Sequence, residues 1–432
     1  MTTSSAQLRI ARLAATPAVH RAFHWLHLQQ PQLRKWQLEI LHIPAPPFGE
    51  QARAAWFLER FEQLGLTNPH LDEAGNALAE LSAVSSEETA PADPATSNPE
   101  PRTPPVILLS AHLDTVFPAA AFAEPTEQET RILAPGACDN AAGLTALLGL
   151  AAALRHGGFA PAVPILFAAN VGEEGEGDLR GMRHLFTRSP YTPRIAAAIA
   201  LEGGGTNAVV TRALASRRFR VTITGPGGHS WTDAGTLNPI LILARALLAL
   251  EAIDQPLLNP LRDGHRTTLN VGQISGGTSI NSIPSSACAW LDLRSTDTDH
   301  LHAAELALRQ SLDQWFNHTS PPGTPGKGAA LSIETIGDRP GGALPDDSPL
   351  LTTLRAVDRH LNLRTEPRLG STDANIPLSL NVPAIAIGGG GIGGGIHTLN
   401  EWYDPTGRNP ALRRILLTLL DTAHLAATVS AP

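Results

Sequence analysis

The sequence is poor in cysteine, in basic charge and in long apolar runs. Only two cysteines, Cys138 and Cys288, occur among 432 residues, which excludes a disulfide framework and makes a reducing compartment the default expectation. No run approaches the roughly 18 apolar residues that a membrane-spanning helix requires. Residues 1–25 carry scattered arginine and histidine and do not resemble a signal peptide. We therefore expect a cytoplasmic protein without a membrane partner.

The charge balance is acidic, with 40 Asp and Glu against 32 Lys and Arg and a formal net charge of −8. Binding to nucleic acid requires a basic face that neutralises phosphates, so nucleic acid is not expected as a partner. Hydrophobic residues make up 42% of the chain and charged residues 17%, which is typical of a well-packed globular protein. A chain of 432 residues exceeds one ordinary core, so two domains are expected.

Short apolar runs that end in polar residues indicate a buried sheet. These runs are residues 106–109, 164–169, 196–201 and 382–387, and helical patterns such as 143–155 lie between them. The alternation predicts an α/β fold, in which a catalytic domain has a mostly parallel sheet flanked by helices. In such sheets ligands bind beyond the carboxyl ends of the strands, and each run here ends near a histidine or a carboxylate.

Two segments depart from this pattern. Residues 82–105 are mainly Ser, Glu, Thr, Ala and Pro and cannot bury enough apolar surface to offset their ordering entropy, so a mobile insertion is predicted there. Residues 215–341 contain alternating strands separated by two helical stretches, which predicts a smaller inserted α+β domain. The catalytic domain would then comprise residues 1–214 and 342–432.

The polar residues at the strand ends are the ligand types of hydrolytic zinc sites. They are His112, Asp114, Asp139, Glu173, Glu174, Glu202 and His397. A single His-x-Asp or Glu-Glu pair is usually a solvated surface pair. Four such motifs at the ends of apolar strands are hard to explain in that way, because a buried carboxylate without a partner is costly and a metal would satisfy several at once.

In this order, the motifs resemble the M20 family of metallopeptidases, which includes glutamate-releasing carboxypeptidases, tripeptide aminopeptidases and aminoacylases. The matching motifs are His112-x-Asp114, Cys138-Asp139-Asn140, Gly172-Glu173-Glu174-Gly175, Leu201-Glu202-Gly203 and Ile396-His397-Thr398. The resemblance covers nearly the whole chain, including the inserted domain. The joint occurrence of five motifs in order is highly specific.

The resemblance implies a site for two divalent metal ions per chain. Asp139 would bridge the two ions. His112 and Glu202 would complete one site, and Glu174 and His397 the other. Zinc is the expected metal, with cobalt or manganese as alternatives for a site so rich in oxygen.

Three further residues are implied in catalysis. Glu173 would be the general base on a water between the metals, and Asp114 would accept the second ring proton of His112 and so fix its tautomer. His229, in a glycine-rich turn of the inserted domain, resembles the lid histidine that family members present to the scissile carbonyl. The sequence leaves open whether His229 acts within its own chain or across a dimer.

The inserted domain also carries residues that resemble the family's substrate-binding groups. Asn281, in Asn281-Ser282-Ile283-Pro284, and Arg294 resemble a clamp for a substrate carboxylate, and Arg339 resembles a second anchor. Arginine suits this role because its planar guanidinium pairs with a carboxylate through two hydrogen bonds. A surface salt bridge is the ordinary alternative for either arginine taken alone.

Two other features have simpler interpretations. Residues 388–395 are rich in glycine but lack the spacing and the Lys-Ser/Thr of a phosphate-binding loop, so a flexible loop with open backbone N–H groups beside the metals is expected. Residues 371–375 are expected to line the same pocket. Cys138 has no assigned base and is interpreted as a packing residue rather than a nucleophile.

These observations predict a di-metal hydrolase that cleaves a peptide or amide bond, most simply in small peptides with a free carboxylate. The alternatives are an N-acyl amino acid amidohydrolase of the aminoacylase type and a non-catalytic binding homologue. Residues 237–244 are predicted to form a helix that is apolar nearly all round, and family members commonly dimerise through the inserted lid domain. A homodimer through this lid/dimerisation domain is therefore expected.

Overall fold

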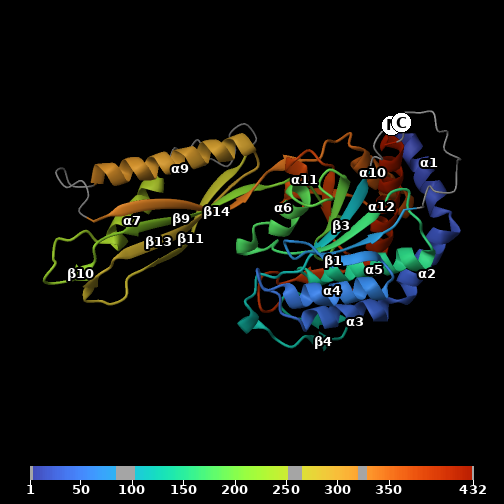
Figure 1. Cartoon of the computed structure of the whole chain (residues 1–432), viewed down its shortest axis with the longest axis horizontal. Helices are drawn as coiled ribbons and strands as arrows, with labels where there is room; N and C mark the ends of the chain where they lie inside the picture. Colours follow the sequence, from blue (N-terminus) through green and yellow to red (C-terminus); the bar gives the residue numbers. More distant parts are fainter. Residues whose placement is uncertain (1–2, 84–102, 252–264, 320–327, 431–432) are drawn as a thin grey trace, which may run out of the picture. The chain divides into compact units, whose positions relative to one another are not determined.

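The computed structural model describes residues 3–83, 103–251, 265–319 and 328–430. The chain divides into two compact units, a main unit of residues 1–213 and 343–432 and an inserted unit of residues 214–342 (Figure 1). Most of the segment predicted to be a mobile insertion, residues 84–102, lies outside the described residues.

The main unit is built on a sheet with the strand order β1-β2-β6-β3-β7-β17-β8-β15, with β16 paired to β8. The strands are β1 (Thr67–Leu71), β2 (Ala77–Leu81), β3 (Val106–His112), β6 (Ile165–Asn170), β7 (Ile195–Leu201), β8 (Ala208–Ala213), β15 (Gly342–Ala343), β16 (Glu366–Gly370) and β17 (Ala384–Ile387). The central strands β6, β3, β7 and β17 pair in parallel, whereas β1, β2 and β8 add antiparallel pairs at the margins. The predicted mostly parallel sheet is confirmed.

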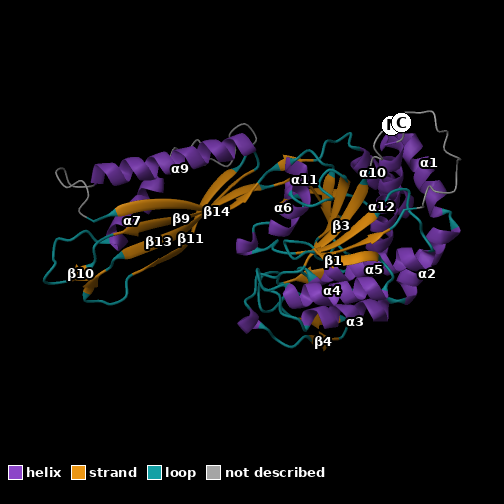
Figure 2. Cartoon of the chain, viewed as in Figure 1, coloured by secondary structure: helices purple, strands orange, loops and turns teal. Residues whose placement is uncertain are grey.

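Helices cover this sheet (Figure 2). They are α1 (Thr3–Ala14), α2 (Pro17–Leu28), α3 (Gln30–Leu41), α4 (Gln51–Gln63), α5 (Ala141–Gly157), α6 (Arg180–Thr187), α10 (Pro349–Leu361), α11 (Asn375–Ser379) and α12 (Arg408–Ser430). Helix α5 is rich in Ala and Leu, which favour helix, and is buried almost throughout because α2, α3 and β3 all pack against it. Within the described ranges, no helix is both long enough and apolar enough to cross a membrane.

A small antiparallel sheet lies at the glycine-rich segment. Its order is β18-β19-β5-β4, formed by β4 (Thr126–Gln128), β5 (Arg131–Leu133), β18 (Ile392–Gly394) and β19 (Trp402–Asp404). Because β18 pairs with β19, the segment between them forms a hairpin loop that carries His397.

The glycine-rich segment is held more firmly than the sequence suggests. The N–H groups of Gly389 and Gly390 donate to the carbonyl oxygens of Gly203 and Gly205, at 2.9 and 3.0 Å. A Cβ at Gly393 would lie 2.3 Å from Cys138 Sγ. The glycines therefore permit close backbone packing, and the expectation of a flexible loop with open N–H groups is wrong for these residues.

The inserted unit is a four-stranded antiparallel sheet with the order β11-β13-β9-β14. Its elements are β9 (Ala215–Thr224), α7 (Pro239–Glu251), β11 (Thr267–Gly276), β13 (Ser286–Ser295), α9 (Thr298–Thr319) and β14 (Ala330–Arg339), with the short pair β10 (Gly228–His229) and β12 (Ser282–Ile283). Helices α7 and α9 contact each other and both pack against β9 and β13 (Figure 1). The core between them includes Phe219, Leu243 and Leu308. This α+β architecture agrees with the predicted fold class.

Candidate metal centre

The carboxyl ends of the central strands bring the predicted metal ligands together. Strand β3 ends at His112, the loop after β6 carries Glu173 and Glu174, and Glu202 follows β7. Asp139 directly precedes the residue that caps the N-terminus of α5. His397 reaches this edge from the β18–β19 hairpin, far away in the sequence.

Asp139 lies between the two histidine rings. Its Oδ1 atom is 3.1 Å from Nε2 of His112, and its Oδ2 atom is 3.1 Å from Nε2 of His397. Two further carboxylates complete the group. Glu202 Oε1 lies 3.4 Å from Nε2 of His112, and Glu174 Oε1 lies 3.1 Å from Nε2 of His397. Each imidazole nitrogen thus faces two carboxylate oxygens, one of which belongs to the shared Asp139.

This donor set suits divalent cations. Nδ1 of His112 lies 3.0 Å from the carbonyl oxygen of Asp114; since a carbonyl can only accept, the proton of the neutral ring is on Nδ1 and the lone pair is on Nε2. That lone pair faces the lone pairs of Asp139 and Glu202, an arrangement that requires a proton or a metal ion between them. Asp139 Oδ1 is buried and has no hydrogen bond of acceptable geometry from any described residue.

The pKa shifts report the same crowding of carboxylates. Burial lowers the pKa of His112, but the nearby carboxylates of Glu202, Asp114 and Asp139 raise the pKa well above its usual range. Hydrogen bonds with Asp139 and Glu174 raise the pKa of His397 to about 10. Burial raises the pKa of Glu202 to about 7. The metal-free site therefore retains protons where a bound cation would replace them.

Asp114 supports the loop that carries the two glutamates. Its Oδ1 and Oδ2 atoms accept the backbone N–H groups of Glu173 and Glu174 at 2.9 and 2.8 Å. Its carboxylate is 3.7 Å from Nδ1 of His112, farther than its own carbonyl oxygen. The contact that fixes the tautomer of His112 is thus with the backbone of Asp114, whereas the prediction placed it on the side chain. Glu173 is buried next to Glu174, with 4% of its surface exposed.

Glu401 is a supporting residue that the sequence analysis missed. It is buried, and its carboxylate accepts three backbone N–H groups, from Gly136, Cys138 and Asp139, at 2.8–2.9 Å. Burial raises its pKa to about 7. These bonds hold the loop that presents Asp139. The only sequence signal is an acidic residue four positions after His397.

Asn140 and Asp373 are two further supports. Asn140 Oδ1 accepts the N–H groups of Gly203 and Gly143, and its Nδ2 donates to Leu201, so it joins the start of α5 to the loop of Glu202. Asp373 is buried and accepts a hydrogen bond at 2.8 Å from Asn170, at the end of β6. This contact brings residues 371–375 to the same edge of the sheet.

Cys138 has the properties of a packing residue, as expected. It is buried, its Sγ atom accepts the N–H group of Gly204 at 3.2 Å, and burial raises the pKa of its thiol to about 12. A thiol with so high a pKa is a poor nucleophile.

The predicted residues of the inserted unit fall into two groups. His229 and Asn281 lie together, because β10 pairs with β12 and Ser230 N–H donates to the carbonyl oxygen of Asn281. Arg294 and Arg339 lie near the other end of the sheet, where both are in register with Ser216 of β9. The predicted clamp of Asn281 with Arg294 is therefore not a single site within one chain.

The separation of these groups follows from strand geometry. Arg294 pairs with Ser216 and Ser286 pairs with Thr224, eight residues away along β13. At about 3.3 Å per residue, the two ends are roughly 26 Å apart. Arg294 is partly exposed and donates to Asp292 at 2.6 Å, whereas Arg339 is buried.

The ring of His229 has a defined orientation. Its Nδ1 atom accepts the backbone N–H groups of Trp231 and Thr232 at 3.2 and 3.4 Å, and the backbone N–H of His229 donates to the carboxylate of Asp233 at 2.7 Å. Because Nδ1 accepts, the proton of the neutral ring is on Nε2. His229 is exposed and so offers Nε2–H as a donor.

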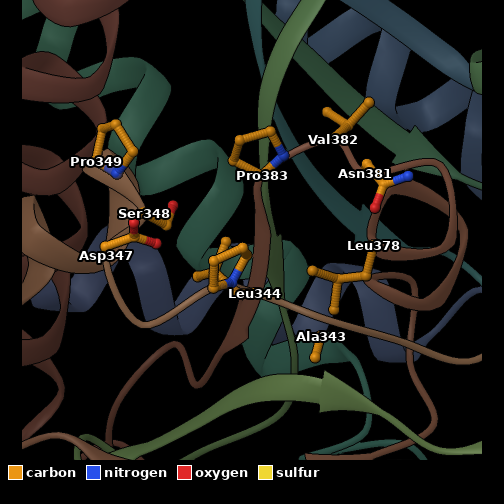
Figure 3. Close-up of a pocket in the computed structure, with 10 residues that line it drawn as sticks. Ala343, Leu344, Asp347, Ser348, Pro349, Leu378, Asn381, Val382 and Pro383 are labelled. Atoms are coloured by element: carbon orange, nitrogen blue, oxygen red, sulfur yellow. The ribbon is translucent and has the colours of Figure 1, made fainter.

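A separate cavity of about 260 Å³ lies beside the start of α10 (Figure 3). Leu344, Ser348, Leu378 and Val382 are among its lining residues. The lining also includes Pro383, which immediately precedes β17, so the cavity lies at the amino end of that strand, whereas the metal-binding residues lie at the carboxyl ends. It is not part of the candidate site.

Comparisons with known proteins agree with this geometry. The sequence model of the family described as "Peptidase family M20/M25/M40" matches residues 108–421 of this chain. Human aminoacylase-1 is 27% identical over 367 residues, which cover 79% of this chain and 82% of that protein. A probable carboxypeptidase of Aspergillus clavatus is 30% identical over 210 residues, which cover 44% of each chain. The chain spans about half the length, or less, of the fungal carboxypeptidase relatives that it matches.

Solved structures share the fold over about nine-tenths of the chain. A tripeptidase of Staphylococcus aureus has a TM-score of 0.68 at 21% identity, covering 91% of this chain and 98% of that chain. A dinuclear metal binding peptidase of Bacillus subtilis has a TM-score of 0.60 at 14% identity, covering 91% and 98%. The main unit has a sheet edged by histidines and carboxylates, and its chain is interrupted by the inserted antiparallel unit. This combination defines the two-unit α/β class that includes metal-dependent hydrolases. The chain belongs to peptidase family M20/M25/M40.

Proposed function

We propose that the chain is a di-metal hydrolase that cleaves an amide bond in small peptides or N-acyl amino acids with a free carboxylate. The observation that carries this proposal is the position of Asp139, with one oxygen 3.1 Å from Nε2 of each histidine. In this proposal Asp139 would be the carboxylate shared by two half-sites, one with His112 and Glu202 and one with His397 and Glu174.

Each of these residues would have a separate role in the hydrolysis. When bound, a pair of divalent ions would lower the pKa of a water molecule and polarise the scissile carbonyl. Glu173 would accept the proton of the attacking water and pass it to the leaving nitrogen. Asp114 would keep Glu173 in place through the bond to its backbone N–H. His229 would donate Nε2–H to the oxyanion that develops on the substrate, and such a donor is worth about 3–4 kcal/mol.

The two groups in the inserted unit favour a site shared between chains. A dipeptide extends over roughly 7 Å. The group of His229 and Asn281 lies roughly 26 Å from Arg294 along the strands, so one dipeptide cannot contact both within one chain. We propose that each site uses Arg294, with Arg339, from one chain to bind the substrate carboxylate, and His229 with Asn281 from the partner chain. The homodimer would form through the inserted unit.

The surface of the inserted unit supports such a dimer. Strand β11 is at the edge of its sheet, and its Val271 and Ile274 are 44% and 56% exposed. Leu241 and Leu248 of α7 are 56% and 62% exposed. An apolar edge strand beside an apolar helix face is suited to association with a second copy. Ile274→Lys should convert the dimer to monomers in analytical ultracentrifugation.

Two substrate classes are to be compared directly. Coverage of the relatives favours the aminoacylase type, since human aminoacylase-1 matches over 82% of its length and the Aspergillus clavatus carboxypeptidase over 44%. The test is a panel of dipeptides, tripeptides and N-acyl amino acids, assayed on chelator-treated protein reconstituted with zinc, cobalt or manganese. Hydrolysis confined to N-acyl amino acids would identify an amidohydrolase. No hydrolysis by a chain that holds two ions would instead identify a binding protein.

A further inference from the structure

Metal-binding side chains meet at a second place among the described residues. His265 lies two residues before the start of β11, whereas Asp297 and His300 lie at the start of α9. Possible ligand atoms of these three side chains all lie within 4.8 Å of one another. The cluster belongs wholly to the inserted unit, and none of its members has a role in the proposed hydrolysis.

The distances between these side chains would allow them to bind one ion. His300 Nδ1 lies 3.0 Å from Asp297 Oδ1, and His265 Nδ1 lies 3.8 Å from Asp297 Oδ2. The two rings are stacked, with centroids 4.7 Å apart. Ligand atoms on one tetrahedral ion with bonds of about 2.1 Å are about 3.4 Å apart. The two observed distances bracket this value, so only small side-chain movements would be needed.

Capping of α9 does not account for the whole cluster. Asp297 Oδ1 accepts the backbone N–H group of His300 at 2.9 Å, which is an ordinary N-cap. That role leaves Oδ2 and the imidazole of His265 unused. His265 Nδ1 is buried and has no hydrogen-bond partner among the described residues. A buried polar atom in that state is costly, and a cation would satisfy it.

The backbone holds the ligands in place before an ion binds. Arg266 N–H donates to Thr296 Oγ1 at 2.9 Å, and Thr296 N–H donates to the carbonyl oxygen of Arg266 at 3.0 Å. The next pair in the ladder, Thr267 and Ser295, is buried with its hydroxyls 2.9 Å apart. His265 and Asp297 flank this doubly bonded junction, so their spacing is set by the sheet.

We propose that His265, Asp297 and His300 bind one divalent transition-metal ion, such as zinc, in addition to the ions of the candidate active site. Two imidazoles and a carboxylate are a preferred donor set for such ions. The three side chains are 30–34% exposed, which leaves a coordination position for water. The ion joins the start of β11 to the start of α9 and so stabilises the inserted unit.

The test is zinc binding by the metal-free full-length protein, measured by equilibrium dialysis and elemental analysis. The variant His265→Ala/His300→Ala should bind about one zinc ion per chain fewer than the wild type. Asp297 is retained because its carboxylate caps α9. The matched control is His302→Ala, an exposed histidine of the same helix whose ring contacts Arg217, and it should bind as many ions as the wild type.

A second variant distinguishes zinc bound by the cluster from zinc bound by the candidate active site. Asp139→Ala/His397→Ala should lose the ions of the candidate metal centre and keep the ion of the cluster. Equal zinc content in the wild type and the His265→Ala/His300→Ala variant would overturn the proposal. If that variant failed to fold, zinc-edge anomalous scattering from wild-type crystals decides instead. A peak between the three residues supports the site, and a zinc-saturated crystal without one refutes it.

Discussion

Mixing two inactive variants, His229→Ala and Glu173→Ala, tests whether each active site is completed by the partner chain. Loss of an oxyanion donor should reduce kcat about 10²–10³-fold, and loss of the general base should reduce it at least about 10²-fold. Each homodimer should therefore retain about 1% of wild-type activity or less. Both residues lie outside the predicted metal ligands, so metal content should be unchanged.

The expected recovery follows from the symmetry of a dimer. Random exchange between equal amounts of the two variants makes half of the dimers heterodimers, and each of these has one complete site out of two. Activity per chain should rise to about one quarter of the wild-type value, roughly 25-fold above either parent. The structural reason is the separation of roughly 26 Å, at about 3.3 Å per residue, between the His229 and Arg294 ends of the sheet.

The assay is steady-state hydrolysis before and after subunit exchange, with exchange monitored by native mass spectrometry of chains that carry different tags. The control is a mixture of wild-type and Glu173→Ala dimers, whose activity should stay at half that of the wild type. No recovery despite demonstrated exchange would refute the shared site, and His229 would then act within its own chain or not at all.

Three other outcomes are expected. Glu173→Gln should keep its metal and lose at least about 10²-fold in kcat, whereas Glu174→Ala should lose metal by elemental analysis; the reverse pattern would exchange their roles. Arg294→Ala should raise KM by the equivalent of roughly 2–4 kcal/mol for substrates with a free carboxylate and change little for amidated ones. Equal turnover of acid and amide by the wild type would remove this role. The pKa of His397 is raised to about 10 in the metal-free site, so zinc must displace its proton at neutral pH. Zinc affinity should therefore increase as pH rises towards that value, by up to about tenfold per pH unit for each proton released, and an affinity that does not depend on pH would contradict this.

The sequence was sufficient to predict the family and the fold class. The runs before His112 and Glu202 are too apolar for an exposed strand and too short to span a membrane, so they indicate a buried sheet, and parallel strands bring their carboxyl ends to one edge. Motifs that end such strands are therefore close in space however far apart they are in the chain. For the same reason the proximity of His112 and Glu174, which meet Asp139 in the structure, was foreseeable from local patterns. Asp139 instead precedes the N-cap of α5, and only the family resemblance predicted it as a bridging ligand.

The supporting contacts were not foreseeable, because they depend on single hydrogen bonds between distant loops. Glu401 is 262 residues from Asp139, whose N–H group it accepts, and no periodicity marks it. The sequence also suggested that Asn281 and Arg294 act together, since only 13 residues separate them. The register of β13 against β9 instead extends that segment along the sheet and places the two at opposite ends. Local composition determined which residues are available for chemistry, whereas strand register, which depends on the packing of the whole sheet, decided which of them can meet.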